Sequence, residues 1–149
     1  MSTKKINFWE PYFFIVFGIF HLHRVWALID RNGYSNFWLK ILNNKGILYF
    51  AIMGILSFLC IRGIITFIKN LNHNYWWRWI YLFGGSYLLF DLCAILFKFD
   101  FWYKILNTMF DVNSPYWNYI WLVFILLGLF SFSLGIILIK IKKIKCSQD

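Results

Sequence analysis

The chain has 149 residues, of which 61% are hydrophobic and 24% aromatic, and its formal net charge is +9. A soluble protein of this length could not bury so much apolar surface, because soluble domains are only about 45–50% apolar. The composition excludes a soluble fold and predicts an all-α integral membrane protein, with residues 1–149 forming a single domain.

Four long apolar runs predict four transmembrane helices in an antiparallel bundle. Each run reaches the roughly 20 residues that a helix needs to cross the hydrocarbon core. Strand-like alternation is absent, and helices satisfy their own backbone hydrogen bonds in lipid. The first run follows two lysines but lacks a small-residue cleavage site, so we expect it to be retained as a span. The predicted spans cover residues 9–29, 46–68, 76–97 and 116–139.

The first predicted span contains a polar segment, HLHR, at residues 21–24. On a helix, Glu10, His21 and Arg24 fall on one stripe, whereas His23 points away from it. A rise of about 1.5 Å per residue leaves Glu10 near the inner end and puts His21 and Arg24 in the outer half of the membrane. Ionised groups in hydrocarbon cost from about 2.5 to more than 10 kcal/mol each, so they persist where they are paired, line water or have a function.

A short sequence recurs after the first and third predicted spans. Residues 36–43 read NFWLKILN and residues 100–107 read DFWYKILN, with six of eight positions identical. Each copy places apolar residues on one helical face and lysine on the other, which predicts interfacial amphipathic helices over about 36–44 and 100–110. Asn36 and Asp100 occupy the expected N-cap positions. The recurrence indicates a duplicated span–helix–span unit; chance similarity is the alternative, since the spans align poorly at this offset.

Two further charged residues lie inside the second and third spans. Asp91 falls in the outer half and shares a helical face with Tyr87, whereas Arg62 falls in the inner third. The economical arrangement pairs these groups at two depths in the membrane. Arg24 and His21 lie with Asp91 in the outer half, and Glu10 lies with Arg62 toward the inner side. The predicted ligand-binding residues are Glu10, His21, Arg24, Arg62, Tyr87 and Asp91.

A structural interpretation of the same residues is the alternative. The long side chain of Arg62 can extend to the cytoplasmic surface and act only as an anchor. If the first span ends near Val25, Arg24 reaches the outer surface and HLHR is simply a polar helix end. Asp91 is the strongest member of the predicted site, because its short side chain cannot extend far.

Small residues form a stripe along the fourth span. Gly128, Ser131 and Gly135 follow one another at three- and four-residue spacing, which allows another helix to approach closely. Packing is a better interpretation of Ser131 than catalysis, since no nucleophile motif surrounds it. The stripe is also a candidate contact face for a homo-oligomer or a larger membrane complex.

Basic residues flank the spans rather than forming one stripe, so they indicate topology and do not support nucleic-acid binding. Eight cations fall on the side that holds both termini and five on the other side. The positive-inside rule therefore predicts a multi-pass protein of the cell (plasma or inner) membrane with both termini in the cytoplasm, and the lipid bilayer is the expected partner.

The sequence predicts no metal site and no cofactor. His21 and His23 are two residues apart and do not converge on one ion from an α-helix. The three cysteines form neither a CxxC motif nor a disulfide framework.

Three classes of function fit these features. The first is a small membrane protein with a polar intramembrane site, which binds or translocates a small ligand or ion or serves as an accessory subunit of a membrane complex. The second is an integral membrane enzyme acting on a lipid or isoprenoid, with His21 and Asp91 as an acid–base pair. The third is a small interaction or immunity-type membrane protein.

Overall fold

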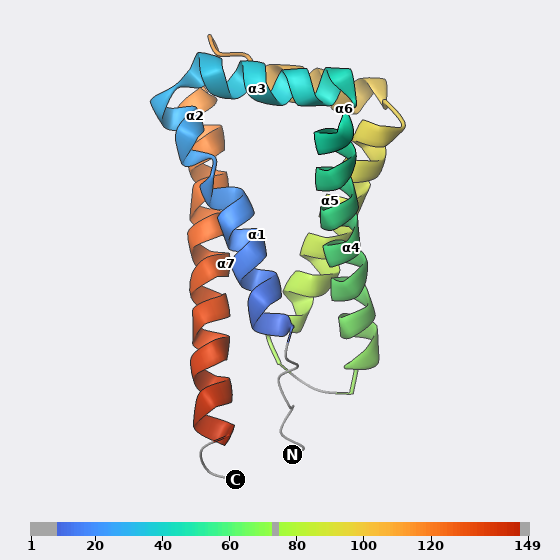
Figure 1. The fold of residues 1–149 in the computed structure, drawn as a ribbon, viewed down its shortest axis with the longest axis vertical. Helices are drawn as coiled ribbons and strands as arrows, with labels where there is room; N and C mark the ends of the chain where they lie inside the picture. The colour runs from blue at the N-terminus through green and yellow to red at the C-terminus, as the bar shows by residue number, and fades with distance from the viewer. Residues whose placement is uncertain (1–8, 73–74, 147–149) are drawn as a thin grey trace. The chain divides into compact units, whose positions relative to one another are not determined.

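The computed structural model describes residues 9–72 and 75–146, and these ranges are helical apart from turns and contain no β-strand (Figure 1). Four stretches of helix are long and apolar enough to cross a membrane. They are Glu10–Ile29, Ile47–Lys69, Arg78–Leu96 and Trp117–Ile141. The prediction of an all-α chain with four potential spans is therefore confirmed, and the bounds agree to within about two residues.

The helices of the described ranges are, in chain order, α1 (Glu10–Leu22), α2 (Val25–Ile29), α3 (Arg31–Asn44), α4 (Ile47–Lys69), α5 (Arg78–Leu96), α6 (Asp100–Met109) and α7 (Trp117–Cys146). They fall into two compact units. The terminal unit, within residues 5–36 and 111–149, holds α1, α2, the start of α3, and α7. The central unit, residues 37–110, holds the rest of α3 with α4, α5 and α6.

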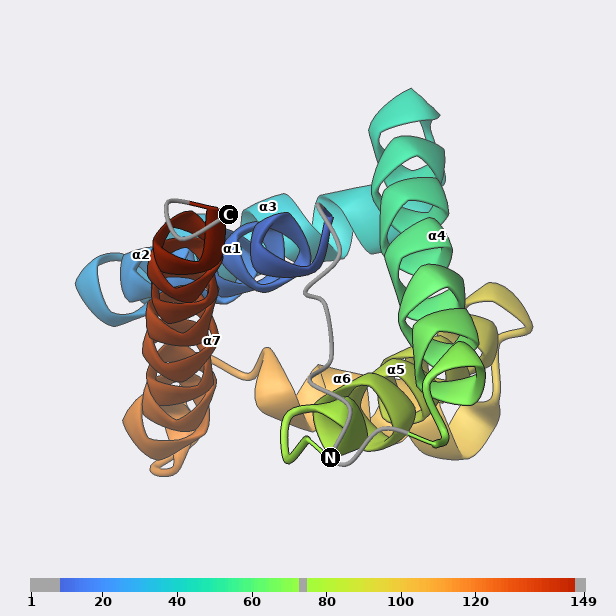
Figure 2. The ribbon, with the colours of Figure 1, turned by 90° about the horizontal axis from the view of Figure 1, so that it is seen from below.

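In the terminal unit, α1 packs along α7, as Figures 1 and 2 both show. The contact passes through glycines, because a Cβ atom on Gly18 would lie 2.7 Å from the Phe132 nitrogen and one on Gly135 would lie 2.8 Å from the Pro11 carbonyl oxygen. Ser131 Oγ donates a hydrogen bond of 2.9 Å to the carbonyl of Phe14 at the same buried contact. The small-residue stripe of the fourth span therefore receives α1 of the same chain.

In the central unit, α4 packs against α5, and α6 folds back onto α5. Gly85 marks the close point of the first contact, since an added Cβ would meet the carbonyl oxygen of Cys60 at 3.3 Å. Large apolar side chains on the other faces of these helices are exposed, among them Phe58 and Phe83 at 62% and 66%. Apolar faces of this size match lipid tails rather than water.

Local sequence explains where the helices begin. Pro11 stands in the first turn of α1, where its missing N–H group leaves no helical hydrogen bond unmade. The carboxylate of Asp30 accepts a hydrogen bond of 2.9 Å from the Gly33 N–H and so caps α3. The N-cap expectation is wrong for both residues. Asn36 lies inside α3, which begins at Arg31, and Asp100 is the first residue of α6, whose N-cap is Phe99 and has no side-chain cap hydrogen bond.

Candidate functional site

The polar segment at residues 21–24 lies where the first apolar stretch is interrupted. α1 ends at Leu22, two residues form a turn, and helix resumes as α2 at Val25. The Arg24 N–H donates to the carbonyl of His21, three residues back, which leaves the Phe20 carbonyl without its usual helical donor. Nδ1 of His23 donates to that carbonyl instead. His23 therefore stabilises the break in the helix.

His21 and Arg24 form a polar pair at this break. The Arg24 guanidinium donates through Nη1 to Nδ1 of the His21 imidazole. His21 is only 6% exposed, and its ring meets Phe17 edge-on at 4.6 Å between centroids. The Arg24 guanidinium carbon lies 4.6 Å from the ring centroid of Phe124 and 5.3 Å from that of Phe20. Aromatic faces thus surround a cation that lies within an apolar stretch.

Tyr34 connects the polar segment at residues 21–24 to an aromatic core. Its hydroxyl lies 3.5 Å from Nε2 of His23, and its ring meets Trp121 edge-on at 5.0 Å between centroids. Burial raises the pKa of Tyr34 to about 12, although the nearby Arg24 charge acts in the opposite direction. The neutral hydroxyl therefore serves as a donor to Nε2, in agreement with the Nδ1 proton of His23 donating to the backbone.

The start of α7 closes the same core. The indole nitrogen of Trp117 donates a buried hydrogen bond of 2.8 Å to the carbonyl of Ala27, and both residues are 0% exposed. Outside the core, the Arg31 guanidinium donates at 2.9 Å to the side-chain oxygen of Asn118. These contacts join the α2–α3 region to the beginning of α7 and fix the surroundings of Arg24.

Asp91 lies in the central unit and has a partner there. The indole nitrogen of Trp102, on α6, donates to the Asp91 carboxylate. The Trp102 ring also lies 5.4 Å from that of Phe90 and 6.5 Å from that of Tyr87, measured between centroids. The contact explains how α6 is held against α5. Tyr87 itself is 59% exposed.

The six predicted site residues are divided between the units. Glu10, His21 and Arg24 belong to the terminal unit, where the structure brings the last two together and buries Glu10 completely. Asp91, Tyr87 and Arg62 belong to the central unit. The pairing of Arg24 with Asp91 and of Glu10 with Arg62 joins different units and stays a prediction.

Three participants were not identified from the sequence. The helical spacing predicts that Trp102 lies on the apolar face of its helix. It does not predict the hydrogen bond from its indole to Asp91, eleven residues earlier. Phe124 contacts Arg24 from α7, which is distant along the chain, and Tyr34 contacts His23 from α3, eleven residues later. The sequence feature that could have predicted two of these contacts is the polar group of Trp102 and of Tyr34, because a buried indole or phenol normally finds a hydrogen-bond partner.

No cluster of three or more metal-ligating His, Cys, Asp or Glu side chains occurs in the ranges that the structure describes. Comparison with known proteins adds no family: no family model, no curated protein and no solved structure matches the chain.

Proposed function

We propose that this chain is a small multi-pass membrane protein that binds a small ligand or an ion at polar side chains within its apolar stretches. The observation that carries the proposal is the pair formed by His21 and Arg24 at the break between α1 and α2, enclosed by the rings of Phe17, Phe20 and Phe124. A guanidinium inside such a stretch is costly, so a role in binding an anionic or polar group is the economical reason for it.

The placement of the pair supports binding over catalysis. Nδ1 of His21 accepts from Arg24, and the ring is nearly enclosed, which limits access for proton transfer to a substrate. An enzyme acting on lipid or isoprenoid, with His21 and Asp91 as acid and base, therefore has less support. Translocation of the ligand, or service as an accessory subunit of a larger complex, remains within the proposal.

Arrangement in the membrane is part of the proposal. We expect the four spans to form one antiparallel bundle in the cell membrane, with the repeated segments of α3 and α6 lying in the interface as halves of a duplicated unit. Eight flanking cations against five favour an orientation with both termini in the cytoplasm. With the three native cysteines replaced by serine, labelling of a single cysteine introduced at Lys104 or at Asn118, from outside intact cells, tests this orientation. Labelling only after the membrane is opened would contradict it.

Four proteins test the site: the parent, Arg24→Leu, Asp91→Leu and the double variant, with Lys40→Leu as a control for loss of an exposed cation. Each is purified in mild detergent, its thermal unfolding is recorded, and bound small molecules are detected by native mass spectrometry. We expect the parent and the control to retain a bound species that the Arg24 variants lose. The double variant should unfold close to the parent if Arg24 and Asp91 neutralise one another.

Two results would contradict the proposal. One is a parent that carries no bound species and whose unfolding temperature is unchanged by salts, protons or added lipid. The other is loss of the bound species in the Lys40 control to the same degree as in Arg24→Leu.

A further inference from the structure

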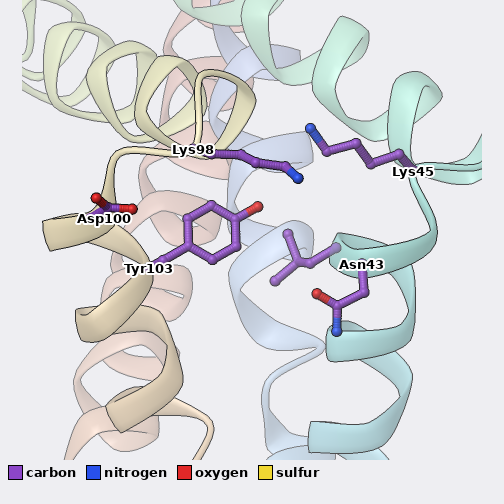
Figure 3. A pocket seen from close by; sticks show the side chains of 6 residues that line it. Asn43, Lys45, Lys98, Asp100 and Tyr103 are labelled. Carbon is purple, nitrogen blue, oxygen red and sulfur yellow. The ribbon is translucent and has the colours of Figure 1, made fainter.

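A pocket of about 310 Å³ lies in the central unit and shares no lining residue with the proposed intramembrane site (Figure 3). Its wall comes from the end of α3, the turn into α4, the turn between α5 and α6, and the first turn of α6. Pockets for small molecules span about 300–1,000 Å³, so this one suits a small group. The lining residues are Leu42, Asn43, Lys45, Lys98, Asp100 and Tyr103.

Both lysines of the pocket occupy backbone positions that normally favour glycine. Lys45 has φ of 44° and Lys98 has φ of 55°, and among the described residues no other non-glycine residue has a positive φ. Each follows a helix: the Lys45 N–H donates to the Ile41 carbonyl at 3.3 Å, and beyond Lys98 the Phe99 N–H donates to the Ala94 carbonyl at 3.0 Å. These are the hydrogen bonds of helix ends that close on a left-handed residue, most often glycine.

The two side chains converge on one space. Figure 3 shows the amino groups of Lys45 and Lys98 directed toward one another, with the hydroxyl of Tyr103 close by. Lys45 Nζ also lies 5.7 Å from the centre of the Tyr49 ring. The Tyr49 hydroxyl is buried and has no hydrogen-bond partner among the described residues. Two ammonium groups that face each other repel, and an anion between them removes that repulsion.

We propose that this pocket binds a phosphate group. Two lysines against one aspartate leave one excess positive charge, which balances the single negative charge of a phosphodiester. Phosphate oxygens can accept from both ammonium groups and from the Tyr103 hydroxyl at once. The proposal is independent of the intramembrane site, because it uses none of the same residues.

The phosphate can come from an anionic lipid headgroup or from free phosphate. The first source has support from the turn itself, where Phe97, Phe99 and Phe101 are 67%, 46% and 69% exposed and offer apolar surface to acyl chains.

The key variant is Lys45→Gly with Lys98→Gly. Glycine favours the positive φ at both positions, so this change removes the charges and keeps the helix ends. The matched control is Lys40→Gln with Lys104→Gln, which lowers the net charge equally at exposed sites outside the pocket. Circular dichroism checks that both variants keep the helical content of the parent.

Binding is measured by titration calorimetry of the detergent-purified full chain with dihexanoyl phosphatidylglycerol, dihexanoyl phosphatidylcholine and inorganic phosphate. We expect the affinity of the parent for phosphatidylglycerol to fall by about tenfold or more in the glycine variant, since hydrogen bonds to charged groups are lost. The control should bind as the parent does, and phosphatidylcholine should bind more weakly, because its choline repels the lysines. Binding of phosphatidylglycerol but not inorganic phosphate would identify a lipid headgroup site, and equal binding would identify a free phosphate site.

Equal weakening in the glycine variant and the control would overturn the proposal, because it would mean that only the overall charge matters. Absence of binding by the parent to both phosphatidylglycerol and inorganic phosphate would overturn it as well. Should the glycine variant lose helical content, Lys45→Arg with Lys98→Arg gives a second test: retained binding supports the proposal and lost binding opposes it.

Discussion

Replacement of Gly18 by alanine tests the contact between α1 and α7. A Cβ atom at this position would lie 2.7 Å from the Phe132 backbone nitrogen and 2.9 Å from the Gly128 carbonyl oxygen. Both atoms belong to the backbone of α7, so neither can rotate away as the end of a side chain would. The two helices must move apart to accept the methyl group.

The size of the effect follows from this geometry. Ordinary contact of a Cβ atom begins at 3.4 Å, so the helices must separate locally by about 0.7 Å. A gap of about 0.5–1 Å loses a quarter to a half of the dispersion energy of the atoms that line it. Overpacking typically costs about 1–3 kcal/mol, and the better helix propensity of alanine returns about 1 kcal/mol. We therefore expect Gly18→Ala to lower the free energy of unfolding by up to about 2 kcal/mol.

Unfolding of the purified protein in mixed micelles, followed by helical content as dodecyl sulfate is added, measures this loss. Gly54→Ala is the matched control, because it is also a change within a helix but nothing lies within 4 Å of the added methyl group. We expect it to be neutral or stabilising by up to about 1 kcal/mol. If Gly18→Ala proves as stable as Gly54→Ala, the close approach of α1 to α7 is wrong.

Three other predictions concern the terminal unit. Trp117→Phe removes the indole donor of the buried hydrogen bond to the Ala27 carbonyl and should lower stability by about 1–3 kcal/mol. Trp76→Phe, at an exposed residue, should change stability little in the same unfolding assay. Ser131→Ala should cost about 0.6 kcal/mol, the average for hydrogen bonds between membrane helices, and a loss near zero would mean that its bond to the Phe14 carbonyl adds nothing. Burial raises the pKa of Tyr34 from 10.0 to about 12, so the unfolded state releases this proton first and stability should fall as the pH rises between these values. Tyr34→Phe should reduce that fall in unfolding measured against pH, and an unchanged pH dependence would contradict the burial of this hydroxyl.

Several features were predictable from the sequence because they depend on neighbours along the chain. The number and bounds of the four apolar stretches follow from length and hydropathy, which is why the predicted 46–68 matches Ile47–Lys69 so closely. The helices after the first and third stretches follow from apolar residues at helical spacing. The polarity of residues 21–24 was also evident, although the break in the helix at this point was not.

The helix break and helix capping show where local reasoning reached its limit. The sequence suggested a continuous helix through His23 and Arg24, because residues 19–29 contain no proline or glycine. The structure instead supplies the Phe20 carbonyl with a side-chain donor, a solution that depends on the orientation of one imidazole ring. Likewise the cap of α3 comes from Asp30, six residues before the expected cap at Asn36.

The tertiary structure alone decided which helices meet. A stripe of small residues on the fourth stretch shows that a helix can approach it, but it does not show which helix does so. The structure identifies that helix as α1, through the contacts of Gly18 and Pro11. The hydrogen bond from Trp102 to Asp91 and the convergence of Lys45 and Lys98 also depend on which segments pack together. Composition and periodicity indicate which face of each segment can be buried. Which helices pack together depends on the shapes and hydrogen-bond donors of segments that are far apart in the chain.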